Sequence, residues 1–210
     1  MTVLLWALIG YVAGLLPSTW IVAGRRRRSA ILDDVRRTVG ETDAHVLLKR
    51  AGGRAATLAA ALDILKGFVP VVLASRVTGP YEVGACAVAV VAGHCWPVVH
   101  YRLAGRGLAA GAGAFLGFLP FEMAVAGVVR VVGSITKAGG LASTIGYVAI
   151  PAIAWLRGQP VPYLVAAVAI NVLIFARRLE GIGRDVAIGL PLPRALVRRI
   201  VFDASALGQR

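Results

Sequence analysis

GHCWPVVHYRLAGRG, residues 93–107, separates two apolar runs, VGACAVAVVA (83–92) and LAAGAGAFLGFLP (108–120). The stretch begins and ends with glycine and contains histidine, proline and arginine in between. Two apolar segments joined by a short cationic turn are typical of membrane helices whose connecting loop faces water on one side of a bilayer. The pattern therefore predicts a helical hairpin in a membrane.

The composition of the whole chain agrees with a membrane protein. Of its 210 residues 58% are hydrophobic and only 16% are charged, and the mean hydropathy is +0.77. Soluble domains carry about 25% charged residues. The net charge of +13 then indicates cationic loops that face anionic headgroups, together with a site for a phosphorylated substrate, in preference to nucleic-acid binding.

Apolar segments of suitable length recur along most of the chain. About 17–25 apolar residues are needed to span the hydrocarbon, and shorter helices are expected where proline interrupts a run, as Pro120 does. The sequence therefore predicts an all-α integral membrane protein with seven helices, at 2–23, 55–75, 83–99, 107–119, 121–135, 141–156 and 161–177.

The distribution of cationic residues predicts the orientation of these helices. With the N-terminus outside, 20 of the 23 Lys and Arg residues fall in segments on the inside, where positive charge concentrates. The C-terminus is then inside. The four arginines at 25–28 follow the first apolar run instead of preceding it, so we expect that run to stay as an anchor and not to be cleaved as a signal peptide.

Cysteine and histidine residues give no sign of a metal site. Cys86 and Cys95 lie nine residues apart on one predicted helix, a spacing that suits neither a disulfide nor zinc. We interpret both as core residues. His45, His94 and His100 lack thiol or carboxylate neighbours at ligand spacing. We expect no metal and no cofactor.

The unusual polar segments all fall on the predicted inside face. Each combines cationic side chains with glycine, which lets backbone N–H groups approach a ligand closely. Gly105, Arg106 and Gly107 stand immediately before the helix expected from residue 108, and a helix N-terminus of this kind suits a phosphate. The alternative is a tight turn whose arginine contacts lipid phosphates. The four segments are 36–54, 100–107, 134–144 and 176–185.

Four sequence blocks resemble the bacterial acyl-phosphate:glycerol-3-phosphate acyltransferases. DILKG (63–67) matches the Asp-x-x-Lys-Gly of that family, and GHCWPV (93–98) matches its Gly-His-x-x-Pro-Val. LAGRGLAA (103–110) stands in place of Lys-Gly-Gly-Lys-Gly-Val-Ala-Thr, and FARRLEGIG (175–183) in place of Tyr-Arg-His-Arg-x-Asn-Ile. The spacing between blocks agrees over about residues 5–185.

The resemblance implies a seven-helix enzyme of the bacterial inner membrane. It would transfer a fatty acyl group from acyl phosphate to glycerol-3-phosphate, or to a related phosphorylated acceptor, and so make lysophosphatidic acid for phospholipid synthesis. Residues 1–185 would form the enzyme domain, and 186–210 would be a basic cytoplasmic tail. The implied phosphate-binding residues are Lys49, Arg50, Gly105, Arg106, Gly107 and Arg178, and the candidates for a catalytic residue are Ser143, His45 and Asp43.

Several positions depart from the family pattern. The Ser and Asn residues of the family's first inside loop have no clear equivalents here, and the first lysine of the family's glycine loop is replaced by Leu103. The family His and Asn near the end of the last helix align with Arg178 and Gly181. An alternative therefore stays open: a non-catalytic or altered-substrate relative that binds lipid or a partner membrane protein.

Two charged residues within a predicted membrane helix call for partners. Asp63 and Lys66 are three residues apart and share one helical face, and charges at such depth usually face the protein interior in pairs. We favour a structural role for this pair; direct help of Lys66 to the phosphate pocket is the alternative. For His94, which stands beside Pro97, we expect donation to a backbone carbonyl freed by the proline, in preference to a catalytic role. In the tail, PRALVRRIV (193–201) predicts a basic amphipathic helix on inner-leaflet headgroups, or else a disordered cationic end.

Overall fold

The computed structural model describes residues 1–23, 52–99, 104–136 and 138–201. Within these ranges every regular element is a helix and there is no strand, which confirms the all-α fold. The helices are α1 (Thr2–Gly14), α4 (Gly53–Val77), α5 (Pro80–Cys95), α6 (Leu108–Phe118), α7 (Pro120–Ile135), α8 (Gly139–Leu156), α9 (Val161–Leu179), α10 (Ile182–Ala187) and α11 (Leu192–Val201), with a further helical turn at 18–23.

Six of the seven expected segments correspond to a helix whose ends lie within a few residues of the prediction. The expected helix 2–23 is instead broken before Pro17, which cannot continue the helical bonding, into α1 and the turn at 18–23. Four of the described helices are long and apolar enough to cross a membrane: Thr2–Ala23, Gly53–Val77, Gly139–Leu156 and Val161–Leu179. The helices α5, α6 and α7 are shorter, at 16, 11 and 16 residues. The count of seven spans and the orientation stay predictions.

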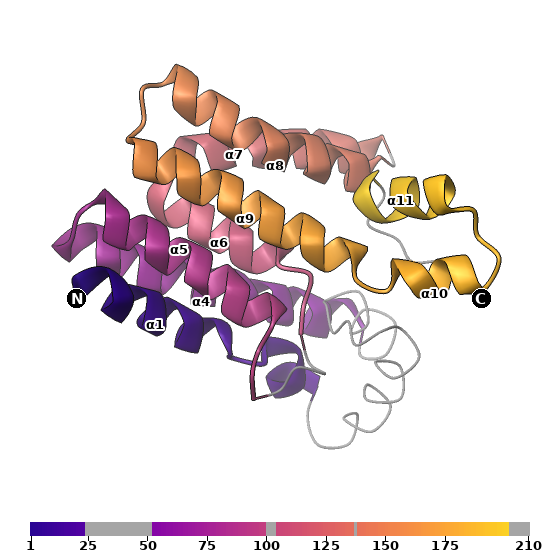
Figure 1. Ribbon diagram of the computed structural model, residues 1–210, viewed down its shortest axis with the longest axis horizontal. Coiled ribbons are helices and arrows are strands. Elements are labelled where there is room, and N and C mark those ends of the chain that lie inside the picture. The colour runs from indigo at the N-terminus through magenta and orange to yellow at the C-terminus, as the bar shows by residue number, and fades with distance from the viewer. Residues whose placement is uncertain (24–51, 100–103, 137, 202–210) are drawn as a thin grey trace.

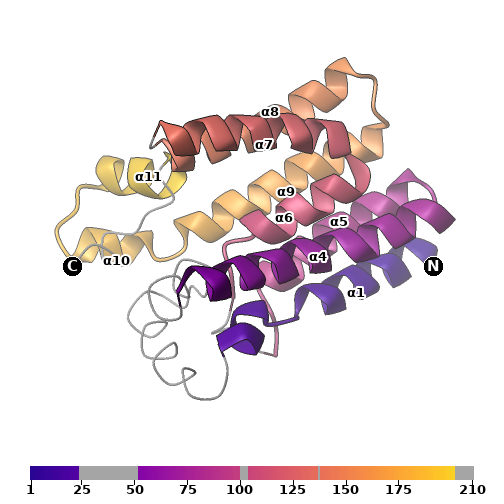
Figure 2. The ribbon, with the colours of Figure 1, turned by 180° about the vertical axis from the view of Figure 1, so that it is seen from behind.

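The helices form a bundle in which consecutive helices from α1 to α9 run in opposite directions (Figures 1 and 2). Helices α6 and α9 lie between the group α1, α4 and α5 on one side and the pair α7 and α8 on the other. The N-terminus of α1 is at one end of the bundle, and α10 and α11 are at the opposite end. We call this opposite end, which carries the described residues 15–23, 96–99, 104–107, 136, 138–139 and 180–201, the loop end.

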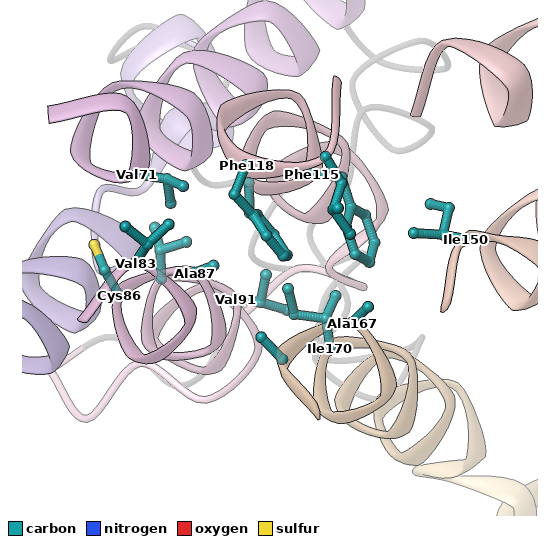
Figure 3. Close-up of a cluster of buried hydrophobic side chains, with 14 of the residues drawn as sticks. Val71, Val83, Cys86, Ala87, Val91, Phe115, Phe118, Ile150, Ala167 and Ile170 are labelled. Carbon is teal, nitrogen blue, oxygen red and sulfur yellow. The ribbon is translucent and has the colours of Figure 1, made fainter. Parts of the chain in front are cut away.

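The core is centred on the aromatic residues of α6 (Figure 3). Phe115 and Phe118 stack with their ring centroids 5.7 Å apart, and they make edge contacts with Tyr147 and Tyr163 at 5.6 and 5.2 Å. Around them lie buried side chains of α4, α5, α8 and α9: Val71, Val83, Cys86, Ala87, Val91, Ile150, Ala167 and Ile170. Cys86 and Cys95 are free and buried, which confirms their interpretation as core residues.

Small residues allow the helix backbones to touch. A Cβ atom added at Gly113 of α6 would lie 2.8 Å from the carbonyl carbon of Ile64 and 2.9 Å from the backbone nitrogen of Phe68, both on α4. A Cβ at Gly10 of α1 would overlap the backbone of Cys86 on α5. Lipid tails are as apolar as the side chains, so such close van der Waals contact is a main source of helix association in a membrane.

An ion pair between the buried Glu122 and the exposed Arg157 joins α7 to the end of α8, at the end of the bundle opposite the loop end. The Glu122 side chain is fully buried, and its Oε1 accepts hydrogen bonds from Arg157 Nη1 at 3.0 Å and from Gln159 Nε2 at 3.4 Å. The guanidinium of Arg157 also lies 4.2 Å from the ring centroid of Phe121. A buried carboxylate needs such partners, so this contact orders the short turn between α8 and α9.

The glycine contacts predict a selective effect of adding one methyl group. We expect Gly113→Ala to lower the free energy of unfolding by about 1–3 kcal/mol, because the methyl group would overpack the α4–α6 contact. Gly127→Ala on α7 is the matched control, since a Cβ there meets no atom of the described residues within 4 Å, and replacing helical glycine usually stabilises. Thermal unfolding in detergent compares the two; an equal effect of both would contradict the proposed close contact.

The alternating helix directions and the charge distribution together predict which loops face outward. We expect an impermeant maleimide to label Thr78→Cys and Gln159→Cys in intact cells, in a background with Cys86 and Cys95 changed to alanine. Thr136→Cys, which is exposed at the loop end, should label only after the cells are permeabilised. The reverse pattern would overturn the orientation.

Candidate phosphate-binding site

The first part of the candidate site is a buried ion pair on α4. Lys66 Nζ lies 2.8 Å from Oδ1 of Asp63, and both side chains are buried. Lys66 also donates a hydrogen bond of 2.7 Å to the carbonyl oxygen of Leu16. That carbonyl lies where α1 ends, just before Pro17, which has no N–H and cannot continue the helical bonding. The pair therefore stabilises both α4 and the break in the first membrane segment.

His94 connects this ion pair to the glycine loop. Its Nδ1 lies 3.5 Å from Oδ1 of Asp63. On its other side the ring packs against Gly105, where a Cβ atom would overlap the imidazole. The N–H of Gly105 donates to the carbonyl oxygen of His94 at 3.2 Å. Close packing therefore requires glycine at position 105, and the loop packs against the end of α5.

Gly107 ends the loop and begins α6. Its φ of +87° lies in the left-handed region that favours glycine, and a Cβ there would lie 2.8 Å from Sγ of Cys95. The first intrahelical bond runs from Gly111 N–H to Gly107 O at 2.7 Å. The first N–H groups of α6 therefore point back toward the loop, as in helix N-termini that bind phosphate. Leu108 begins the helix, as the sequence predicted.

The last turn of α9 holds the loop from the opposite side. Arg177 is 5% exposed; its Nε donates to the carbonyl oxygen of Gly105 at 3.2 Å, and it forms an ion pair with Glu180. Glu180 also accepts a hydrogen bond from the indole N–H of Trp96 at the end of α5. Our sequence analysis missed Arg177 and Glu180. Their spacing of three residues at a helix end was the available signal.

Arg178 contacts α8 and α11. It is 2% exposed, and its Nη1 donates to Oγ1 of Thr144 and to the carbonyl oxygen of Ile200, each at 2.8 Å. Ser143, the predicted candidate beside it, donates to the carbonyl oxygen of Gly139 in its own helix at 2.8 Å. The sequence analysis named Ser143 and missed Thr144, because one step along a helix turns the side chain by about 100°.

The structure brings most of the described candidates to the loop end, on two sides of the start of α6. Asp63, Lys66, His94, Gly105 and Gly107 form one connected cluster, and Arg106 lies half-buried within its loop. Ser143 and Arg178 lie on the side formed by α8, α9 and α11. The candidates Asp43, His45, Lys49 and Arg50 lie outside the described residues. Their expected convergence with Arg106 stays a prediction.

A polar pocket and an apolar cavity adjoin each other at this end. The pocket is lined by polar side chains that include Ser18, Asp63, Lys66 and His94. The cavity has a volume of about 590 Å³, is lined by apolar side chains of α1 and α4, and shares Lys66 and residues 15–17 with the pocket. The pocket has a volume of only about 10 Å³, no more than a water molecule needs, so the apolar cavity alone is large enough to hold part of a lipid chain.

Known proteins of one family match nearly the whole chain. The family model described as glycerol-3-phosphate acyltransferase matches residues 4–187. The glycerol-3-phosphate acyltransferase of Rubrobacter xylanophilus is 35% identical over 179 residues, which are 84% of this chain and 87% of that protein.

Two crystal structures of PlsY (YgiH), an integral membrane glycerol 3-phosphate acyltransferase, share the fold. The glycerol 3-phosphate form superposes with a TM-score of 0.76 at 24% identity and covers 89% of this chain and 93% of that one. The lysophosphatidic acid form has a TM-score of 0.74 at 23% identity, over 93% of this chain and 99% of that one. The helical arrangement is therefore that of a known membrane enzyme.

The geometry of the ion pair predicts how its two members respond to substitution. We expect Lys66→Met to lower the free energy of unfolding by about 3–5 kcal/mol, because Asp63 would stay buried without its cation. The double variant Asp63→Asn with Lys66→Met should recover most of that loss, since no unpaired charge remains.

Thermal unfolding and an assay of acyl transfer on the double variant separate the two roles left open for this pair. A stable, active double variant supports the structural role. A stable variant without activity would instead assign Lys66 to the phosphate pocket.

Proposed function

The chain belongs to the glycerol-3-phosphate acyltransferase family, and on that premise we propose that it transfers a fatty acyl group from an acyl phosphate to glycerol-3-phosphate at the loop end. It is a multi-pass protein of the bacterial inner membrane, and its product in phospholipid synthesis is lysophosphatidic acid. The family match over residues 4–187 supports the activity. The choice of acyl donor and the roles of individual residues are the proposal.

The observation that carries the proposal is the glycine loop at the start of α6, next to a polar pocket and an apolar cavity. The loop places Arg106 between two glycines, directly before N–H groups that have no intrahelical acceptor. The cavity of about 590 Å³ accommodates part of an acyl chain, and polar side chains that include Asp63, Lys66 and His94 adjoin it.

The proposed reaction needs positioning and charge compensation more than strong acid–base catalysis. The hydroxyl oxygen of glycerol-3-phosphate forms a bond to the acyl carbonyl carbon, and the bond from that carbon to the phosphate oxygen breaks. The electron pair leaves with the phosphate, and the hydroxyl proton ends on the released inorganic phosphate or on a protein base. Phosphate is already a good leaving group. Cations that hold two phosphate-bearing molecules side by side therefore supply most of the catalysis.

In this proposal Arg106 binds a substrate phosphate together with the N–H groups of the Gly107 turn. Arginine suits this role because its planar fork contacts two phosphate oxygens at once. Arg178, Lys49 and Arg50 are the further cations proposed to bind phosphate. The proposed candidates for a catalytic group are Ser143, which lies on the first turns of α8, and His45 and Asp43, which lie outside the described residues.

Substitution of Arg106 tests the proposal. We expect Arg106→Ala to lower acyl transfer at least about tenfold, because a hydrogen bond to a charged group contributes about 1.5–3 kcal/mol, and Arg106→Lys to fall in between, since it keeps the charge without the fork. The matched control is Arg76→Ala, because Arg76 is exposed and lies in the last turn of α4, away from the loop end. The measurement is phosphate release from an acyl phosphate by purified protein, with and without glycerol-3-phosphate.

The same assay decides between this enzyme and the alternative relative. A wild-type protein that shows no transfer and no affinity for either phosphate compound would contradict the proposed activity. The chain would then be a non-catalytic or altered-substrate relative that binds lipid or a membrane partner, and a related phosphorylated acceptor would be the next compound to assay.

A further inference from the structure

Helix α11 lies beyond the part of the chain that matches the family. The match ends at residue 187, and α11 spans Leu192–Val201. At the loop end it packs against the ends of α8 and α9 (Figures 1 and 2). The buried face of α11 carries Ala195 and Arg199, four residues apart, while Leu192, Arg194 and Val197 are exposed. The sequence predicted this basic amphipathic helix but gave no reason to bury one of its arginines.

The guanidinium of Arg199 binds the C-terminal end of α9. It is 2% exposed, and its Nη1 donates to the carbonyl oxygen of Arg178 at 3.1 Å and to that of Glu180. Its Nη2 donates to the carbonyl oxygen of Gly181 at 3.3 Å. The last carbonyls of a helix have no intrahelical donors and carry partial negative charge, so a cation here stabilises the helix end.

Asp185 holds Arg199 in this position. Its carboxylate is fully buried, and Oδ2 accepts a hydrogen bond of 2.5 Å from Arg199 Nε. A buried pair of this kind is strongly disrupted when one partner is removed, because the other charge stays buried. The Asp185–Arg199 pair therefore connects the short helix α10, which carries Asp185, to α11.

The membrane helices α8 and α9 in turn donate hydrogen bonds to α11. The carbonyl oxygen of Ile200 accepts hydrogen bonds from Arg178 Nη1 at 2.8 Å and from Thr144 Oγ1 at 2.9 Å. Arg178 therefore donates to α11 with its side chain and accepts from α11 with its backbone. The two directions of bonding fix α11 in both position and orientation.

The end of α9 that Arg199 binds also contacts the glycine loop. Arg177 donates to the carbonyl oxygen of Gly105, and its partner Glu180 binds the indole of Trp96 at the end of α5. Carbonyls on both sides of this turn, those of Arg178 and Glu180, are the acceptors of Arg199. A continuous set of contacts thus leads from α11 through the α9 terminus to the loop that carries Arg106.

We propose that Arg199, with Asp185, is a positioning residue for the phosphate-binding loop Gly105–Gly107. Arg199 contacts no substrate; it fixes the last turn of α9, and that turn holds Gly105 through Arg177. The proposal rests on the proposed function for the role of the loop, but the contacts from Arg199 to α9 and from α9 to Gly105 do not depend on it.

The test compares Arg199→Met with Arg194→Met, an exposed arginine on the same helix. Hydrogen exchange followed by mass spectrometry reports the order of the loop without any substrate. We expect Arg199→Met to speed exchange in peptides covering 104–108 and 178–185 by at least about tenfold, with the rest of the bundle and the melting temperature of the core changed far less. Arg194→Met should match the wild type.

Steady-state kinetics supply the second readout. We expect Arg199→Met to raise the KM for glycerol-3-phosphate by about tenfold, the order seen when a supporting partner of a binding group is lost, and to leave kcat within about twofold. Arg199→Lys should recover part of the affinity, because it keeps the cation but loses the fork. A chain ending at Leu190 should reproduce the effects of Arg199→Met.

Each outcome has one meaning. The positioning role is overturned if Arg199→Met and Arg194→Met show the same hydrogen-exchange rate in 104–108. It is also overturned if the truncated chain is more active than the wild type, a result that would make α11 inhibitory. If exchange responds as expected while the wild type shows no acyl transfer, the proposed function fails and the positioning of the loop stands.

Discussion

The Asp63–Lys66 ion pair is the interaction on which the arrangement of the loop end depends. Charge inside a membrane helix is costly and usually faces a partner within the protein. Lys66 pairs with Asp63 and also donates to Leu16 at the break of the first segment. Asp63 in turn faces His94 on α5. One pair of charges thus connects α1, α4 and α5 at the loop end.

Gly105 is where the two polar clusters of the loop end meet. His94 packs against it from the side of α4 and α5, and Arg177 binds its carbonyl oxygen from the side of α9. A side chain at this position would separate the two clusters, since the space of its Cβ is filled by the imidazole. The loop that carries Arg106 is therefore held at Gly105 from both sides.

Much of the fold followed from apolar length and from proline and glycine. The break at Pro120, the start of α6 at Leu108 and the basic helix near 193–201 were all predicted. The site was predicted less completely. Gly105, Gly107, Asp63, Lys66 and His94 were named and lie together, because glycine in a turn and charge in a membrane helix are visible along the chain. Arg177, Thr144 and Arg199 were missed, since the partners that give them their roles lie 14 to 72 residues away in sequence.

The sequence by itself determined that this chain is an all-helical membrane protein with a cationic loop end, because the cost of placing polar groups in hydrocarbon acts on each segment separately. Only the tertiary structure decided which partners each of several similar arginines binds. Arg177 holds the glycine loop, Arg178 binds α8 and α11, and Arg199 caps α9. These roles depend on direction and on partners from distant segments, and hydrogen bonds of about 3 Å form only once the helices have packed.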